Sequence, residues 1–151
     1  MKLIDPSATT PIVQLSVLAS ESAAQSYAIG RALYTLRAQN IAIIGSGFAT
    51  FHNLRLMFSG TSSTPEFKKQ NIEWSNAVTD AAMSSEEDEQ RLKKFESWRN
   101  WPASYTMHPR GGAEHFLPLI VCAGAAGPTE GRSYKDDFRG IDMWSYYWDE
   151  Q

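Results

Sequence analysis

The sequence predicts an α/β fold with a partial, mostly parallel sheet flanked by helices. Three observations predict it. Apolar residues alternate with polar ones over residues 11–18, as in a half-buried strand. Apolar residues then recur at helical spacing over 22–39, and the wholly apolar 41–44 is typical of a strand buried on both faces. Strand, helix and strand in this order form a βαβ unit, whose two strands are normally parallel.

The ends of the first helix are marked by residues that favour helix caps. Ser22 and Gln25 have the spacing of a capping box, which predicts that the helix begins here. Asn40 is a residue that tolerates the left-handed conformation in which helices commonly end. The helix is therefore expected to stop at Gln39, directly before the second predicted strand.

The second half of the chain is predicted to be largely helical. Pro65 is suited to the first position of a helix. A second N-cap is expected at Ser85, with the acidic residues 86–89 in the first turn, where the helix dipole favours negative charge. The apolar stretch 113–126 predicts a buried helix closed by a glycine and a proline, and 127–139 is expected to be a loop. Residues 142–148 predict a terminal strand.

This reading yields about three strands, whereas a sheet usually has roughly five or six. So few strands would leave sheet edges and apolar surface uncovered. The 151 residues are expected to form a single domain, 1–151, that is part of a larger α/β unit. We therefore expect self-association or a partner chain that completes the sheet.

Composition narrows the function classes. Lys and Arg number 14 against 17 Asp and Glu, and this balance argues against a dedicated nucleic-acid binder. No apolar run reaches the roughly 18 residues that predict a membrane span, and no apolar stretch typical of a signal peptide follows Lys2. The lone Cys122 excludes a disulfide framework and favours a reducing compartment, so a cytoplasmic location is expected.

Three histidines, His52, His108 and His115, are the candidates for chemistry. His52 follows a predicted strand, at the end where open α/β sheets place ligands. Glu114 adjoins His115, so a mixed histidine and carboxylate metal site is conceivable, although a purely structural role stays open for each histidine. The turn 45–47 follows a strand but lacks the third small residue of a dinucleotide fingerprint, because Thr50 occupies that position.

Two motifs resemble a known family. Residues 43–55, IIGSGFATFHNLR, resemble a segment of the class III extradiol ring-cleavage dioxygenases of the 4,5-DOPA dioxygenase type. Residues 108–110 (HPR), 114–119 (EHFLPL) and 123–127 (AGAAG) resemble the second conserved segment of the same family. The two motifs lie in the same order as in the family, so the whole chain is expected to share its fold.

Other stretches match the family in order, and there are departures. Residues 11–16, 30–33 and 143–147 are similar to family segments, whereas Phe51 looks like a one-residue insertion and the loop 110–112 is slightly long. The family's N-terminal half carries "His-Gly" and "His-Trp" segments that supply metal ligands, and this sequence has neither. The chain therefore resembles only the C-terminal part of the catalytic subunit.

The resemblance implies a metal-dependent enzyme that opens an aromatic ring beside its diol. It implies Fe(II) or Zn(II) as the metal, and a small catechol-type diol and O2 as substrates. By match to the motifs, His52 would be the catalytic acid and base and His115 a metal ligand. His108, Asn53 and Gly47 would contact the substrate or support the metal ligands. Two alternatives stay open: a catalytically incomplete remnant or partner subunit of such an enzyme, and a small nucleotide-binding α/β module.

Overall fold

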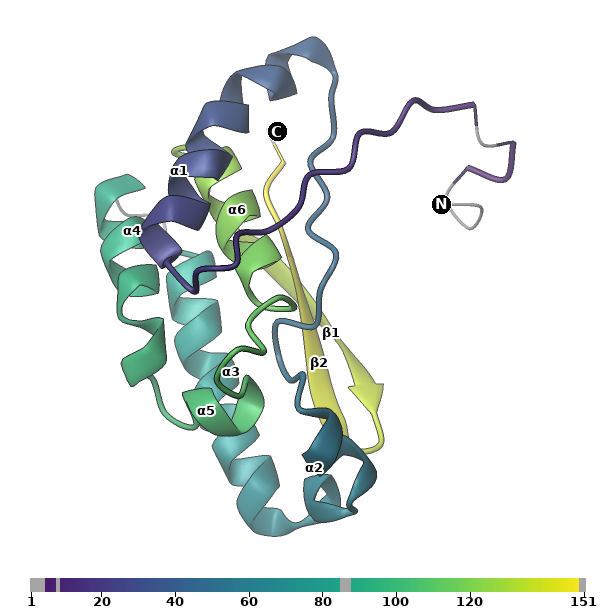
Figure 1. The fold of residues 1–151 in the computed structure, drawn as a ribbon, viewed down its shortest axis with the longest axis vertical. Coiled ribbons are helices and arrows are strands. Elements are labelled where there is room, and N and C mark those ends of the chain that lie inside the picture. Colours follow the sequence, from purple (N-terminus) through teal and green to yellow (C-terminus); the bar gives the residue numbers. More distant parts are fainter. Residues whose placement is uncertain (1–4, 8, 85–87, 150–151) are drawn as a thin grey trace.

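The computed structural model describes residues 5–7, 9–84 and 88–149, and the following bounds refer to those residues (Figure 1). In chain order the elements are α1 (Ala23–Leu33), the 3-10 helix η1 (Tyr34–Gln39), α2 (Leu54–Phe58), η2 (Thr61–Ser63), α3 (Pro65–Ala82), α4 (Asp88–Glu96), η3 (Trp98–Asn100), α5 (Ser104–Met107), α6 (Leu117–Ala125), β1 (Arg132–Phe138) and β2 (Ile141–Tyr147).

Helices α1 and α6 pack with their backbones in contact. A Cβ atom at Gly30 would lie 2.1 Å from the carbonyl oxygen of Val121, and one at Gly124 would lie 2.3 Å from that of Tyr27. Only glycine permits this approach, so the crossing point is fixed by two glycines that face each other's helix. The predicted cap at Ser22 is confirmed, since its side chain accepts a hydrogen bond from the N–H of Gln25.

The first helix changes type before it ends. Its α-helical part stops at Leu33, and the predicted remainder up to Gln39 is the 3-10 helix η1. Asn40 then adopts the left-handed conformation with φ 59°, so the predicted stop at this residue is confirmed.

Helix α3 begins as the sequence predicts and supplies the centre of the core. Pro65 opens the helix, Thr64 caps it, and the buried Trp74 packs against the rings of Trp98 and Phe116. The last predicted helix begins at Leu117, not at residue 113.

No helix of the described ranges is both long and apolar enough to cross a lipid bilayer.

The predicted N-cap, Ser85, and the first two acidic residues after it, Glu86 and Glu87, lie outside the described residues. Asp88 and Glu89 occupy the first turn of α4, as expected for acidic residues at a helix N-terminus. Asp88 also accepts hydrogen bonds from the side chains of Tyr27 and Arg31 on α1, and so ties α4 to α1.

The sheet differs from the prediction. Among the described residues it has two strands, β1 and β2, which pair antiparallel from Arg132 opposite Tyr147 to Phe138 opposite Ile141. The predicted terminal strand is confirmed as β2. The expected loop at 127–139 instead contains β1, whose polar, mostly exposed side chains give no alternating pattern to detect. The prediction of a mostly parallel sheet is therefore wrong for the part of the chain that the structure describes.

The two other predicted strands, 11–18 and 41–44, are extended segments without a strand partner (Figure 1). They are not buried either, because the side chain of Val13 is 92% exposed and that of Ile44 is 69% exposed. The physical reason is that a strand exists only when a neighbour pairs with it. An apolar sequence can favour an extended backbone but cannot supply the neighbour.

Candidate metal and substrate site

His52 is held at the start of α2 by hydrogen bonds to the end of α5. Its backbone N–H donates to the carbonyl oxygen of Met107 at 3.0 Å. The next residue, Asn53, caps α2 by accepting from the N–H of Leu56, and its amide donates to the carbonyl of Thr106 at 2.9 Å. The side chain of Asn53 is therefore used to fix the backbone beside His52.

Glu114 and His115 lie on the turn that leads into α6. The N–H groups of Phe116 and Leu117 both donate to the carbonyl oxygen of Ala113, which closes the turn. Gly47 lies directly against it, because a Cβ atom there would be 2.3 Å from the carbonyl oxygen of His115. The sequence-predicted residue Gly47 thus allows the two motifs to touch through their backbones.

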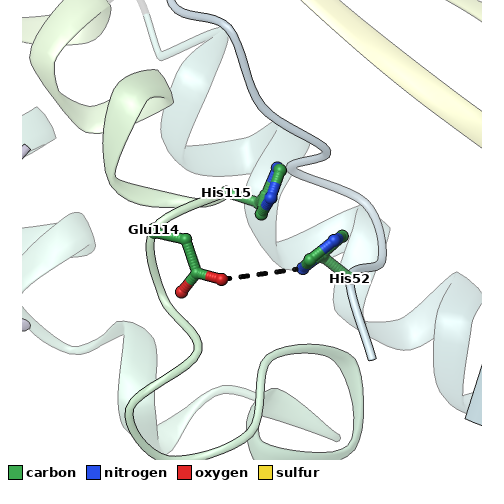
Figure 2. Close-up of side chains that lie close together, drawn as sticks. All are labelled: His52, Glu114 and His115. Carbon is green, nitrogen blue, oxygen red and sulfur yellow. Dashed lines mark ion pairs between the residues drawn. The ribbon is translucent and has the colours of Figure 1, made fainter. Parts of the chain in front are cut away.

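The side chains of His52, Glu114 and His115 converge (Figure 2). The two imidazole ring centroids are 3.5 Å apart, and the Nδ1 atom of His52 lies 4.0 Å from Oε1 of Glu114. One potential ligand atom from each residue lies within 4.8 Å of the others. The structure therefore brings together two motifs that are about sixty residues apart, in a set of donors that suits a divalent transition metal.

The environment of His52 favours a neutral imidazole. Burial lowers the pKa of His52, and the neighbouring His115 lowers it further, while the carboxylate of Glu114 opposes the shift. The Nδ1 atom of His115 is buried and has no hydrogen-bond partner among the described residues. Phe48 covers both rings, with its ring centroid 6.1 Å from that of His52 and 5.9 Å from that of His115. Neutral imidazoles are the form that binds metals.

His108 lies behind this group and is not part of it. Its side chain is fully buried against Trp74 and Phe116. Its Nε2 atom lies 3.0 Å from the carbonyl oxygen of Ala49 and must donate, because a carbonyl can only accept. Burial lowers the pKa of His108 to about 4. His108 therefore supports the chain segment that leads to His52.

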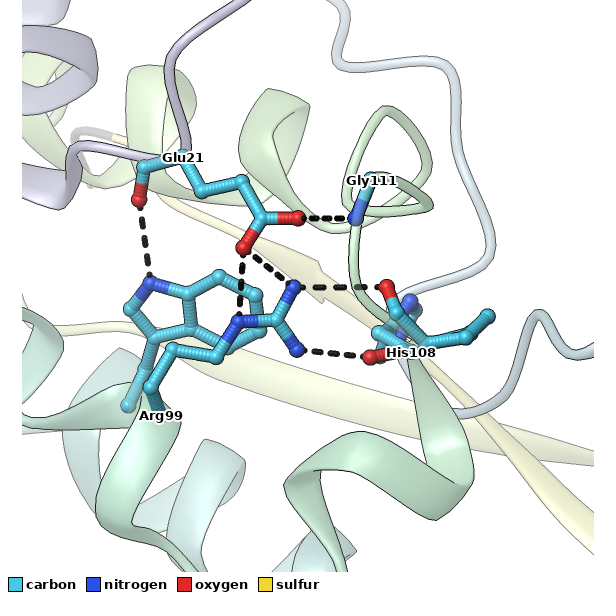
Figure 3. Close-up of polar contacts among 6 residues, drawn as sticks. Glu21, Arg99, His108 and Gly111 are labelled. Carbon is cyan, nitrogen blue, oxygen red and sulfur yellow. Dashed lines mark hydrogen bonds and ion pairs between the residues drawn. The ribbon is translucent and has the colours of Figure 1, made fainter.

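The ion pair between Arg99 and Glu21 holds the loop that runs from His108 to Glu114 (Figure 3). Arg99 contacts the carboxylate of Glu21 at 2.6 Å and donates to the carbonyl oxygen of His108 at 2.6 Å. The other carboxylate oxygen of Glu21 accepts from the backbone N–H of Gly111 at 2.8 Å. These contacts connect the start of α1 to the loop that precedes Glu114.

The glycine turn that could have bound a nucleotide is used for packing. A Cβ atom at Gly45 would lie 2.8 Å from both the Cys122 sulfur and the Pro118 carbonyl oxygen, so this backbone rests on α6. The next helix begins only at Leu54, so the turn does not lie at a helix N-terminus, where a phosphate would bind. This geometry does not favour the nucleotide-binding alternative.

The sequence indicates Glu114 as a possible metal ligand beside His115, but no pattern in it shows that Glu114 faces His52. Two other contributors are not predicted. Phe48 and the pair of Glu21 with Arg99 had no sequence signal, because their partners are remote along the chain. Only the fold shows which side chains meet.

Comparison with known proteins places these motifs in a family. Residues 1–148 match the family model described as "Catalytic LigB subunit of aromatic ring-opening dioxygenase". No solved structure matches the chain.

Curated relatives carry dioxygenase names. The chain is 47% identical to "Dioxygenase tasH" of Hapsidospora irregularis over 98% of this chain and 47% of the relative. It is 38% identical to the "4,5-DOPA dioxygenase extradiol" of Mirabilis jalapa, over 81% of this chain and 42% of that relative. An Escherichia coli protein of the same name is 30% identical over 80% of this chain and 42% of its own length. The chain thus spans about half the length of these relatives, and it belongs to the family of catalytic LigB subunits of aromatic ring-opening dioxygenases.

Proposed function

We propose that this chain supplies part of the metal and substrate site of an extradiol dioxygenase that opens a catechol-type, DOPA-like ring. The observation that carries the proposal is the convergence of His52, Glu114 and His115 in a chain of this family. The relatives named 4,5-DOPA dioxygenases support the choice of an aromatic diol and O2 as substrates.

The residues present fit a divalent metal, Fe(II) or Zn(II). The buried Nδ1 of His115 has no partner within the described chain, and a carboxylate oxygen of Glu114 lies within 4.8 Å of a ring nitrogen of His115. Imidazole and carboxylate ligands together are typical of mononuclear iron and zinc sites. We assign His115 as a ligand and Glu114 as a neighbouring carboxylate that completes or orients the set. When bound, the metal would lower the pKa of a substrate hydroxyl and orient the diol and O2.

His52 is the proposed proton acceptor. Because burial and His115 lower its pKa, its imidazole is neutral at cellular pH and can take a proton from a substrate hydroxyl. The resulting imidazolium would face the carboxylate of Glu114, 4.0 Å away. The same imidazole can return the proton as the ring opens, since it acts as acid after acting as base.

Phe48 is positioned to contact the substrate ring. Its own ring lies against both imidazoles, yet its side chain is 52% exposed, so one face is free. Aromatic rings associate in offset or edge-to-face pairs. A planar diol held beside His52 would pack on this face.

The reaction balances without a further reductant. One carbon–carbon bond of the ring next to the diol breaks, and both atoms of O2 enter the product. The proposed role of this chain is to bind the diol, hold it against Phe48 and move its hydroxyl proton to His52.

The test distinguishes the proposed metal ligand, His115, from the proposed base, His52. The purified chain is loaded anaerobically with Fe(II), bound iron is measured by elemental analysis, and oxygen uptake is followed on adding DOPA. We expect His115→Ala to lose the iron and His52→Ala to keep the iron but lose turnover. His108→Gln is the matched control and should keep the iron. Wild-type chain that binds no iron above background would contradict the proposed site, and loss of iron in His52→Ala would make His52 a ligand.

A second candidate, a catalytically incomplete partner subunit, is favoured by one observation. The chain covers 47% or less of the relatives described above. Stoichiometric iron without oxygen uptake would support this candidate, whereas iron with uptake would exclude it.

A further inference from the structure

We infer that this protein has an open slot for one β-strand, between the extended segment 41–45 and the outer edge of β2. We propose that the occupant is a strand from the part of the relatives' length that has no counterpart in this chain. The inference rests on family membership and geometry. It does not depend on the proposed chemistry.

The slot is a groove of about 550 Å³. One wall is the segment 41–45, and the opposite wall is formed by residues 144–148 at the end of β2. Leu119, Cys122 and Ala125 of α6 form the floor. Gly45 rests directly on α6, and residues of α6 and of the end of β2 line the same groove.

The edge of β2 that faces the groove can be identified from the hydrogen bonds. The N–H of Trp144 donates to Oγ1 of Thr50, and the carbonyl oxygen of Trp148 accepts from Arg37. Both groups therefore point away from β1. In an antiparallel pair alternate residues share this direction, so the N–H and C=O of Tyr146 also face the groove. Within the described chain, neither of these two Tyr146 backbone groups has a partner.

The opposite wall is equally unpaired. Within the described part of the chain, residues 41–44 donate and accept no backbone–backbone hydrogen bond. A row of unpaired N–H and C=O groups on an extended backbone is a template for pairing with another strand, so both walls can accept one. A strand of five residues is about 16 Å long, which matches the length of the segment 41–45.

The slot is lined in part by apolar side chains. Its floor is made of small and aliphatic side chains, and Ile41 and Ile44, which also line the slot, are exposed. Exposed apolar side chains beside unpaired backbone groups suit contact with another polypeptide. The occupant is therefore an extended segment with apolar side chains facing α6, bound by main-chain hydrogen bonds as in strand addition.

The length of the relatives indicates where the added strand comes from. The match to the Hapsidospora irregularis relative covers 98% of this chain but only 47% of the relative. More than half of that relative therefore lies outside the match, and a strand from that part is the proposed occupant. We propose this source over a second copy of the chain.

The experiment co-expresses this full chain with a tagged polypeptide that carries the uncovered part of the Hapsidospora irregularis relative. The readouts are co-purification, mass by light scattering, and the alkylation rate of Cys122. Cys122 is the chain's single cysteine and lies on the slot floor. We expect a one-to-one complex in which Cys122 reacts about tenfold more slowly, as for a group that reacts only when the strand opens. A double variant, Cys122→Ser with Ser63→Cys, places the thiol at an exposed site and should show equal rates in both states.

A matched pair of proline variants tests whether the segment 41–45 pairs with the added strand. Consecutive N–H groups of an extended segment point to opposite edges, so only one of Ala42→Pro and Ile43→Pro removes a donor that faces the slot. We expect one of the two to weaken the complex by about tenfold or more, while the other serves as its control. Circular dichroism checks that both variants fold. If either does not, the Cys122 rates still decide the question.

Three results would overturn the inference: no co-purification, a complex in which Cys122 reacts at the free rate, or protection of Cys122 by self-association of this chain alone. His52→Ala, whose side chain does not line the groove, should form the complex like the wild type. Failure of the metal site and failure of the strand slot are therefore distinguishable.

Discussion

At the scale of single residues, His108 and His115 show how burial separates similar side chains. Both belong to one motif, and in the part of the chain that the structure describes both have a buried Nδ1 atom without a hydrogen-bond partner. His108 faces Trp74 and Phe116 and donates to a carbonyl, whereas His115 faces His52. His108 thus stabilises the core, and His115 faces the candidate metal site.

His108 should make stability depend on pH. Its pKa is lowered to about 4 in the folded chain from an ordinary value near 6.5, so protonation favours unfolding. The contribution is complete above about pH 6.5 and is lost as pH falls toward 4. Its upper limit is about 3 kcal/mol. Urea unfolding of the wild type and of His108→Gln, measured from pH 7 to 4, should show a smaller loss in the variant. Equal pH dependence would contradict this assignment.

At the scale of elements, the crossing of α1 and α6 sets the position of the site. Residues 113–116 lead into α6, and the segment 41–47 rests on this helix, so the two motifs meet only if α6 is seated correctly. Gly30 and Gly124 determine that seating because each contacts the backbone of the other helix. Helix propensity disfavours both glycines, and tertiary packing overrides it.

Gly30→Ala should therefore destabilise the protein, although a glycine-to-alanine change inside a helix ordinarily stabilises it by roughly 0.5–1 kcal/mol. The added Cβ would lie 2.1 Å from the Val121 carbonyl oxygen, and we expect overpacking to cost about 1–3 kcal/mol. Ala28→Gly on the exposed face of α1 is the control and measures propensity alone. Denaturant unfolding gives both values, and a stabilised Gly30→Ala variant would exclude the close packing.

At the scale of the whole molecule, the described chain combines a compact helical body with extended segments that lack partners. The aromatic core around Trp74 joins α3 to η3 and to the turn before α6. The segments 11–18 and 41–44 lie on the outside of this body and expose Val13 and Ile44. The molecule thus offers paired strands on one side of a groove and an unpaired segment on the other.

Hydrogen exchange should map this division. In the dilute chain, amides of 41–44 should exchange quickly because no backbone carbonyl of the described chain accepts from them. Amides inside α6 and those of β2 that face β1 should be protected by their regular hydrogen bonds. Mass spectrometry of peptides from these regions gives the rates. Strong protection of 41–44 in the isolated monomer would mean that the segment is already paired.

The sequence by itself determined what depends on neighbours along the chain. Ser22, Asn40 and Pro65 mark helix ends because caps act within a few residues, and the motifs around His52 and His115 are contiguous.

Only the tertiary structure decided what depends on partners far along the chain. It grouped Glu114 with His52 and His115, and it placed His108 in the core. It also left 41–44 unpaired while pairing the polar β1 with β2. Burial and strand pairing are properties of two surfaces that meet, and a local pattern describes only one of them.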